Sequence, residues 1–206
     1  MEGILEVYKR PYDPLVPVVC VDETNRQLIE ETRVSIEAKP GQVKRVDYEY
    51  KRNGVANLFM MFVPLEAKRF VKVSKHRTRE DFAYCIKDLV DIHYAHAEKI
   101  VLVMDNLNTH SLGSLYEAFE PTEAKRIAEK LEIHYTPKHG SWLNMAEIEI
   151  GVMGRQCLSE YIPTIEQMKK EVASWQFNRN MQCTSVNWQF TTEDARIKLK
   201  SLYPEI

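Results

Sequence analysis

Residues 100–110 read IVLVMDNLNTH, an apolar run that turns polar at Asp105. Five consecutive apolar residues followed by turn-forming residues are typical of a strand that is buried on both faces. A second strand of this kind, predicted over residues 16–22, ends on another carboxylate, Asp22. Chemistry in sheets of this type collects at the carboxyl ends of the strands, so we expect Asp22 and Asp105 to lie at one edge of the sheet.

A third acid, Glu147, lies in the first turn of a helix that we expect over residues 145–158. Three converging carboxylates form a hard, all-oxygen site that suits Mg²⁺ or Mn²⁺. Two such ions suit phosphodiester chemistry, because one activates the attacking oxygen and the other stabilises the leaving oxygen. We therefore assign Asp22, Asp105 and Glu147 as candidate catalytic and metal-binding residues, and we expect two ions.

Each of these acids also has an ordinary structural interpretation. Asp22 can end a strand or cap a helix, and Asp105 can bind the backbone amides of its own turn. Asn144 and Glu147 have the spacing of a helix capping box, which would occupy the glutamate carboxylate. Glu23 is a neighbouring competitor of Asp22, but along a strand its side chain points to the opposite face of the sheet.

The order of the remaining elements predicts the fold class. Extended segments come first, and helices alternate with strands after residue 78, which implies a mixed α/β sheet with helices on its faces. The expected strands are 16–22, 26–37, 46–50, 56–63, 70–73, 100–104 and 132–135, with a tight turn at Arg52-Asn53-Gly54. The expected helices are 79–93 (capped by Thr78), 114–130, 145–158, 164–178 and 192–202.

Composition bounds the class of protein. The chain has 206 residues, 44% hydrophobic, with 28 Lys and Arg against 30 Asp and Glu. No apolar run is long enough to span a bilayer, and the start lacks the features of a secretory signal. The four cysteines form no Cys-x-x-Cys pair, so we expect reduced thiols in a cytosolic protein. A net charge of -2 argues against a strong stand-alone binder of nucleic acid.

One local cluster of basic residues departs from this balance. It lies between residues 68 and 79 and contains Lys68, Arg69, Lys75 and Arg77. Such a cluster is either a solvated face of the protein or a surface that contacts phosphates. The two interpretations are about equally favoured by the sequence.

Two stretches together resemble a known family. VMDNLNTH at 103–110 and YTPKHGSWLNMAE at 135–147 are similar to the catalytic core of bacterial insertion-sequence transposases of the Tc/mariner superfamily. The stretches 39–41, 48–54 and 190–196 are also similar to this family, so the resemblance covers nearly the whole chain. These are DDE transposases with an RNase H-like fold.

The resemblance implies a five-stranded RNase H-like sheet and metal-dependent cleavage of DNA at element ends, followed by transfer of the 3′ ends to a target. It implies that Asp22, Asp105 and Glu147 are the three acids. As a hypothesis from the residues, we expect DNA, both transposon ends and target, to contact the loop before Glu147 and the basic cluster. The expected DNA-binding residues are His139, Ser141, Trp142, Lys68, Arg69, Lys75 and Arg77.

Family members normally carry N-terminal helix-turn-helix domains that recognise the element ends. We expect residues 1–15 to be a lead-in segment and residues 16–206 to be the catalytic domain, without that recognition region. A homodimer or a partner polypeptide that supplies DNA recognition is therefore expected, with no membrane involvement. Two alternatives stay open, namely a non-catalytic or regulatory transposase remnant and a plain RNase H-like nuclease.

Overall fold

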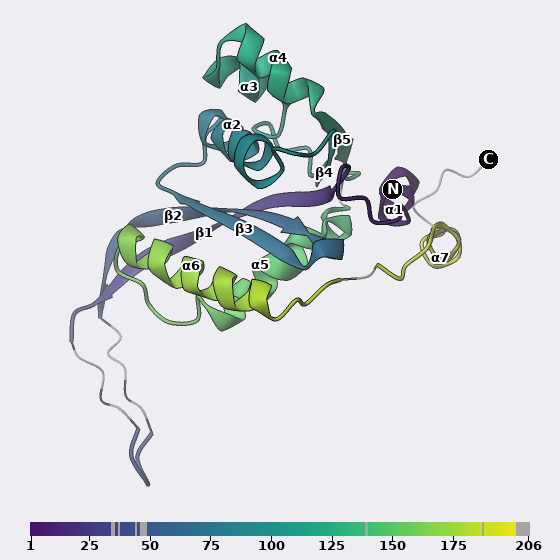
Figure 1. The fold of residues 1–206 in the computed structure, drawn as a ribbon. Helices are drawn as coiled ribbons and strands as arrows, with labels where there is room; N and C mark the ends of the chain where they lie inside the picture. The colour runs from purple at the N-terminus through teal and green to yellow at the C-terminus, as the bar shows by residue number, and fades with distance from the viewer. Residues whose placement is uncertain are drawn as a thin grey trace.

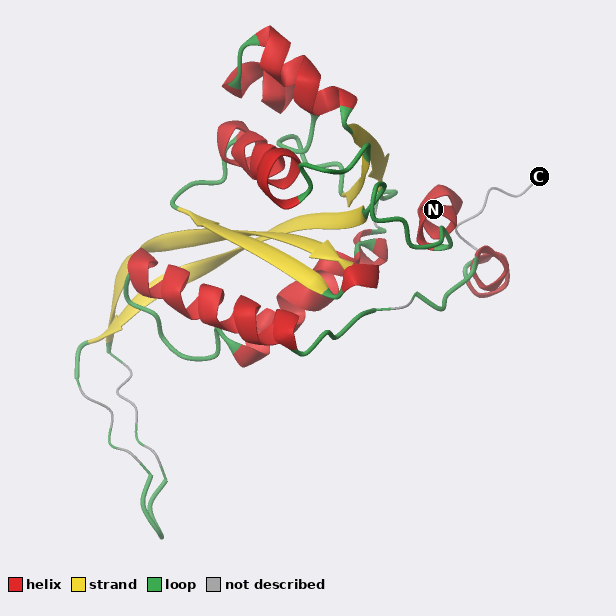
Figure 2. Cartoon of the chain, in the orientation of Figure 1, coloured by secondary structure: helices red, strands yellow, loops and turns green. Residues whose placement is uncertain are grey.

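A single five-stranded sheet runs through the molecule in the order β3-β2-β1-β4-β5 (Figures 1 and 2). The computed structural model describes residues 1–33, 36, 38–43, 45, 49–138, 140–186 and 188–200. β1 pairs antiparallel with β2, and β2 with β3, whereas β4 pairs parallel with β1 and with β5. The predicted mixed five-stranded sheet is thereby confirmed. The strands are β1 Val18–Glu31, β2 Tyr50–Val63, β3 Lys68–Ser74, β4 Ile100–Met104 and β5 Leu131–Tyr135.

Helices cover both faces of this sheet. In Figure 1, α2, α3 and α4 lie on one side of the sheet, and α5 and α6 lie on the other. In the described part of the chain, no helix is long and apolar enough to cross a bilayer. The helices are α1 Glu2–Tyr8, α2 Arg79–Asp88 with a π-helical turn Leu89–His93 (η2), α3 Leu112–Ala118, α4 Pro121–Glu129, α5 Met145–Gln156, α6 Ile165–Met181 and α7 Thr192–Lys198, with short 3₁₀ helices at Pro64–Glu66 (η1) and Ser141–Leu143 (η3).

The two faces of the sheet bury separate apolar clusters. Along β1, Val19 and Val21 pack on the side of α2, whereas Cys20 packs on the side of α5 and α6. This alternation follows from the two-residue period of a strand. Within the expected lead-in segment, α1 buries Ile4 and Leu5 in the same cluster as Cys20.

Strand β1 is longer than the sequence predicted. Most of the expected segment 16–22 and the first part of 26–37 belong to one strand, Val18–Glu31, because β1 stays paired with β2 from Cys20 to Glu31. Residues 34, 35 and 37 of the second segment lie outside the described residues. The expected turn at residues 52–54 is wrong. Gly54 has a φ of +102°, but it lies inside β2, where the register with β1 shifts between Gln27 and Ile29. Positive φ at a glycine serves a β-bulge as well as a tight turn.

The predicted helix 114–130 is two helices. α3 ends at Ala118, and α4 begins at Pro121. Proline has no N–H to donate to the preceding turn, and it forces the residue before it, Glu120, into an extended conformation. The predicted cap at Thr78 is confirmed as a capping box with Asp81. Within the predicted strand 46–50, residues 46–48 lie outside the described residues.

Candidate active site

The parallel pairing of β1 with β4 sets Asp22 level with Asp105. Cys20 pairs with Val103 in this register, so the residues two positions further along each strand are Asp22 and Asp105. β4 ends at Met104, whereas β1 continues beyond that point against β2. Asp22 therefore lies inside β1 and not at its end, but it lies where the neighbouring strand stops. The two aspartates therefore lie side by side because of the register between β1 and β4, and not because both strands end there.

Asn144 attaches the start of α5 to β1 beside Asp22. Its side chain is fully buried, and its Nδ2 donates to the carbonyl oxygen of Val21 at 2.8 Å and to Oδ2 of Asp22 at 3.4 Å. Its Oδ1 caps α5 by accepting the backbone N–H of Ala146 at 3.1 Å. In the described part of the chain, the Glu147 carboxylate has no hydrogen-bond or ion-pair partner, so it does not take part in capping.

The charges of the three candidate acids influence one another. Burial is the main cause that raises the pKa of Asp22 to about 7, against a hydrogen bond from the backbone N–H of Glu23. The negative charges of Asp105, Glu23 and Glu147 raise it further. Asp22 therefore holds a proton near neutral pH, which a bound cation would displace.

The carboxylates of Asp22, Asp105 and Glu147 do not form a complete metal site in this structure. In the described ranges of the chain, no three His, Cys, Asp or Glu side chains are close enough to hold one metal ion. The donor set still suits a hard cation, because Glu147 is unpartnered and Asp22 is destabilised in its charged form.

His110 bridges Asp105 to a fourth acid, Glu23. Its Nδ1 lies 2.7 Å from Oδ1 of Asp105, and its Nε2 lies 2.7 Å from Oε2 of Glu23. Burial lowers the pKa of His110, but the two carboxylates outweigh burial and raise it to about 9. The same contact is the main cause that lowers the pKa of Asp105. His110 is thus a buried cation that orients Asp105, and the other oxygen of Asp105 stays available.

Glu23 takes part in the site, although the sequence suggested only a competitor of Asp22. As expected for a strand, it points to the opposite face, where it meets His110 and the guanidinium of Arg77 at 3.3 Å. Its side chain is 3% exposed, so it is as buried as a core residue. No local sequence signal pairs Glu23 with His110, because the two side chains meet only once β4 lies beside β1.

The loop before α5 presents two of the predicted DNA contacts. Ser141 and Trp142 are exposed on η3, and the Trp142 ring stacks on Trp188 with centroids 6.4 Å apart. Phe190 meets Trp142 edge-on at 5.8 Å. His139, the third predicted contact in this loop, lies outside the described residues.

The basic cluster does not form one continuous surface. Lys68 pairs with Glu66 at 2.8 Å, whereas Lys75 and Arg77 are exposed after β3. The prediction that Arg69 contacts DNA is wrong, because its side chain is fully buried and its guanidinium bonds to protein groups. Arg77 lies closest to the site, since its charge helps to lower the pKa of Asp105.

The raised pKa of Asp22 predicts a pH-dependent effect of Asp22→Asn on the metal-free protein. In the unfolded chain this acid ionises near pH 4, but in the folded chain it keeps its proton up to about pH 7. The free energy of unfolding of the wild type therefore falls as pH rises from about 4 to about 7, because the unfolded chain can ionise Asp22 and the folded chain cannot. We expect Asp22→Asn to add about 4 kcal/mol to the free energy of unfolding at about pH 8 relative to about pH 4, because the amide never ionises and a pKa difference of about three corresponds to this energy.

Urea denaturation in the presence of EDTA at about pH 4, 6 and 8 measures this difference. Asp13→Asn, which changes an exposed aspartate outside the site, serves as the matched control and should show no such trend. A stability difference for Asp22→Asn that does not change with pH would contradict the burial argument.

The chain is similar in sequence to one protein family and in fold to two solved structures. Residues 17–169 match a family described as DDE superfamily endonuclease. The fold is similar to the crystal structure of the Mos1 strand transfer complex, with 15% identity, 89% of this chain and 58% of that chain covered, and a TM-score of 0.57. It is also similar to the Mos1 mariner paired end complex with Mn, with 14% identity, 89% and 59% coverage, and a TM-score of 0.54.

The likeness to these structures, at such low identity, concerns the fold, and the predicted RNase H-like fold is thereby confirmed. The chain spans less than two thirds of the length of either solved chain. No curated protein sequence matches it.

Proposed function

The chain belongs to the DDE superfamily endonuclease family, and on this premise we propose that it is the catalytic domain of a bacterial insertion-sequence transposase of the Tc/mariner type. It cleaves DNA at the ends of a mobile element and joins the 3′ ends to target DNA. The observation that supports the proposal is the register that sets Asp22 level with Asp105, together with Asn144, which joins the start of the helix of Glu147 to β1 beside Asp22.

DDE endonucleases generally use divalent metals, and we propose that Asp22, Asp105 and Glu147 hold two Mg²⁺ or Mn²⁺ ions. When bound by these residues, such ions would supply activation of the attacking water or 3′-hydroxyl and charge stabilisation at the leaving oxygen. His110 orients Asp105 through Nδ1, and Asn144 orients Asp22 through Nδ2. Among the described residues, these contacts leave Oδ2 of Asp105 and both oxygens of Glu147 without a hydrogen-bond partner, and we propose that they face the substrate and its ions.

The DNA path follows from the exposed side chains around these acids. Trp142 and Ser141 flank the start of α5, and Arg77 and Lys75 are exposed after β3. Arg77 can hold a phosphate next to Asp105, and Trp142 offers an apolar ring to a base or sugar. Because the net charge is -2, tight binding of element ends needs further contacts, from a second copy or from a DNA-recognition segment or partner.

Metal binding is expected to raise the melting temperature of the protein. At a Mn²⁺ concentration of about 100 times the dissociation constant, linkage adds about 2.7 kcal/mol. For a chain of this size, that corresponds to a rise of roughly 5–10 °C. Asp105→Asn should remove most of the rise, because it removes a ligand charge but keeps the contact with His110. Differential scanning calorimetry with and without Mn²⁺ measures it, and an unchanged rise in the variant would show that the cation binds elsewhere.

Cleavage of labelled DNA from the ends of the encoding element tests the function itself. At low salt with Mn²⁺ we expect nicking and, when a pre-cut 3′-hydroxyl end is supplied, joining to a second duplex. EDTA should abolish both reactions. Cleavage of RNA–DNA hybrid in preference to duplex DNA would favour the plain nuclease, and no reaction even with a fused DNA-binding domain would favour a non-catalytic remnant.

A further inference from the structure

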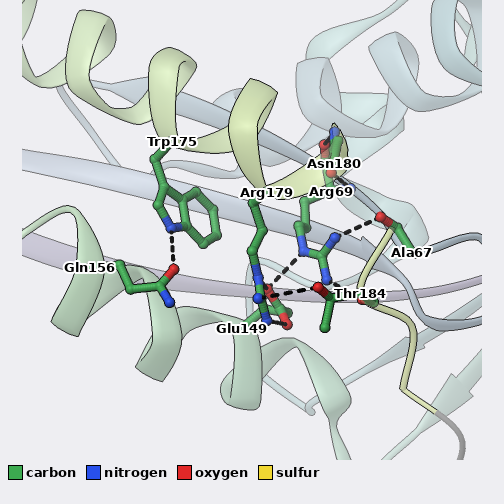
Figure 3. A network of polar contacts seen from close by, with 8 residues as sticks. All are labelled: Ala67, Arg69, Glu149, Gln156, Trp175, Arg179, Asn180 and Thr184. Carbon is green, nitrogen blue, oxygen red and sulfur yellow. Dashed lines mark hydrogen bonds and ion pairs between the residues drawn. The ribbon is translucent and has the colours of Figure 1, made fainter. Parts of the chain in front are cut away.

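A buried network of charges lies between α5, α6 and the start of β3 (Figure 3). Glu149 receives Nε of Arg69 at 2.7 Å and Nη2 of Arg179 at 3.2 Å. Arg69 and Glu149 are 0% and 1% exposed. The remaining nitrogens of Arg69 donate to the carbonyl oxygens of Ala67 and Thr184, each at 2.6 Å. Glu149 of α5 thus binds one arginine from β3 and one from α6, and Arg69 also holds the segment that follows α6.

Helix α6 is attached to the sheet at the same place. The side chain of Asn180 pairs with both backbone groups of Arg69, accepting its N–H at 2.9 Å and donating to its carbonyl at 3.0 Å. Gln176 accepts the N–H of Val71 at 2.7 Å. β3 is an edge strand, and these amides satisfy backbone groups that would otherwise be open. Arg69 and Arg179 thus form a fixed frame for Glu149.

The buried face of α5 depends on this glutamate for its orientation. That face consists of Met145, Ala146, Glu149 and Met153, whereas the apolar Ile148 is 43% exposed. An acid lies in the middle of the face that packs on the core, so apolar contacts alone define the rotation of α5 poorly. Glu147 lies two residues away, about 200° round the helix axis, and faces the other way.

Because the network consists of buried charges, we expect it to fix the orientation of α5 more than to stabilise the fold. The Glu149 carboxylate accepts hydrogen bonds from two arginines, and both Glu149 and Arg69 are fully buried. Apolar residues of similar volume often replace buried ion pairs without loss of stability. Where such pairs are retained, fixing one arrangement of the elements is their best-attested use.

We propose that Glu149, held by Arg69 and Arg179, is a positioning residue that sets the rotation of α5 and thereby presents Glu147 to Asp22 and Asp105. The inference rests on the catalytic role proposed above for Glu147. A small rotation of α5 displaces the Glu147 carboxylate, and a displacement of about 1 Å in a catalytic group can cost on the order of 100-fold in rate.

Glu149→Gln tests this, with two readouts that a purely structural role would not move. In the full chain we expect kcat for DNA cleavage to fall roughly 10- to 100-fold and the Kd for Mn²⁺, measured by electron paramagnetic resonance, to rise about tenfold. KM for DNA should change less than about twofold. Arg179→Lys keeps a cation beside Glu149 and should retain most of kcat.

Leu89→Ala, in the apolar cluster on the opposite face of the sheet, is the control for lost stability. It should leave kcat and the Mn²⁺ affinity near wild type below its melting temperature. If Glu149→Gln keeps the kcat and the Mn²⁺ affinity of wild type, the inference is overturned. It is also overturned if Leu89→Ala lowers both quantities as much as Glu149→Gln does. If wild type itself neither binds Mn²⁺ nor cleaves, the proposed function is wrong and the inference falls with it.

A second variant covers the case in which Glu149→Gln does not fold. The combination Arg69→Met, Glu149→Leu and Arg179→Met removes all three charges together and is expected to fold, since no unpaired charge is left. It should show the same fall in kcat. Wild-type kcat in this folded triple variant would overturn the positioning role.

Discussion

Glu147→Gln is expected to reduce metal-dependent DNA cleavage by at least about 1,000-fold, or about 4 kcal/mol of transition-state stabilisation. The glutamine keeps the shape of the side chain but removes the charge that would hold a cation. The fold should be unaffected, because in the described part of the chain the Glu147 carboxylate makes no hydrogen bond or ion pair. Single-turnover cleavage of labelled element-end DNA with Mn²⁺ measures the rate.

The matched control is Glu160→Gln, which changes an exposed glutamate after the end of α5. It removes the same charge from the protein but lies away from the edge that holds Asp22. Its rate should stay within about twofold of wild type. Equal rates for wild type and Glu147→Gln would rule out a role for this acid in the chemistry.

Arg69→Met is expected to cost about 3–5 kcal/mol in the free energy of unfolding, because it leaves a buried carboxylate without its main partner. Only the longer contacts of Arg179, at 3.2 and 3.4 Å, would remain on Glu149. The carbonyl oxygens of Ala67 and Thr184 would also lose their donor. Urea denaturation followed by circular dichroism measures the loss.

Arg126→Met provides the comparison on the surface. Arg126 also contacts two acids, Glu123 and Asp91, but its side chain is 46% exposed, so its loss should cost about 1 kcal/mol or less. Placing Arg69→Met in a Glu149→Leu background should recover part of the loss, since the unpaired charge is gone. A cost below that of Arg126→Met would contradict the buried network.

Apolar runs and capping signals predicted the elements that carry the site. The run 100–104 is β4 from its first residue to its last, and Thr78 caps α2. The sequence predicted that Asp22 and Asp105 share one edge of the sheet, but it did not predict the register between β1 and β4. The length of β1 depends on its pairing with β2 and not on its own composition. The helix break before Pro121 could have been predicted from the proline itself, which the prediction of one helix over 114–130 did not take into account.

The buried charges were harder to predict, because their partners are far apart in sequence. Arg69 and Glu149 are 80 residues apart, and basic neighbours made Arg69 look like part of an exposed cluster. Alternation along β3 held the missing signal, since Arg69 shares a face with Val71 and Val73, which pack against the core. His110 and Glu23 likewise meet only once β4 lies beside β1.

Locating Mn²⁺ by anomalous scattering, in crystals grown with that ion, tests the central claim most directly. We expect anomalous peaks within ligand distance of the carboxylates of Asp22, Asp105 and Glu147, and we expect Asp105→Asn to weaken them. A well-occupied Mn²⁺ bound elsewhere on the protein, with none among these three acids, would contradict the assignment of the site.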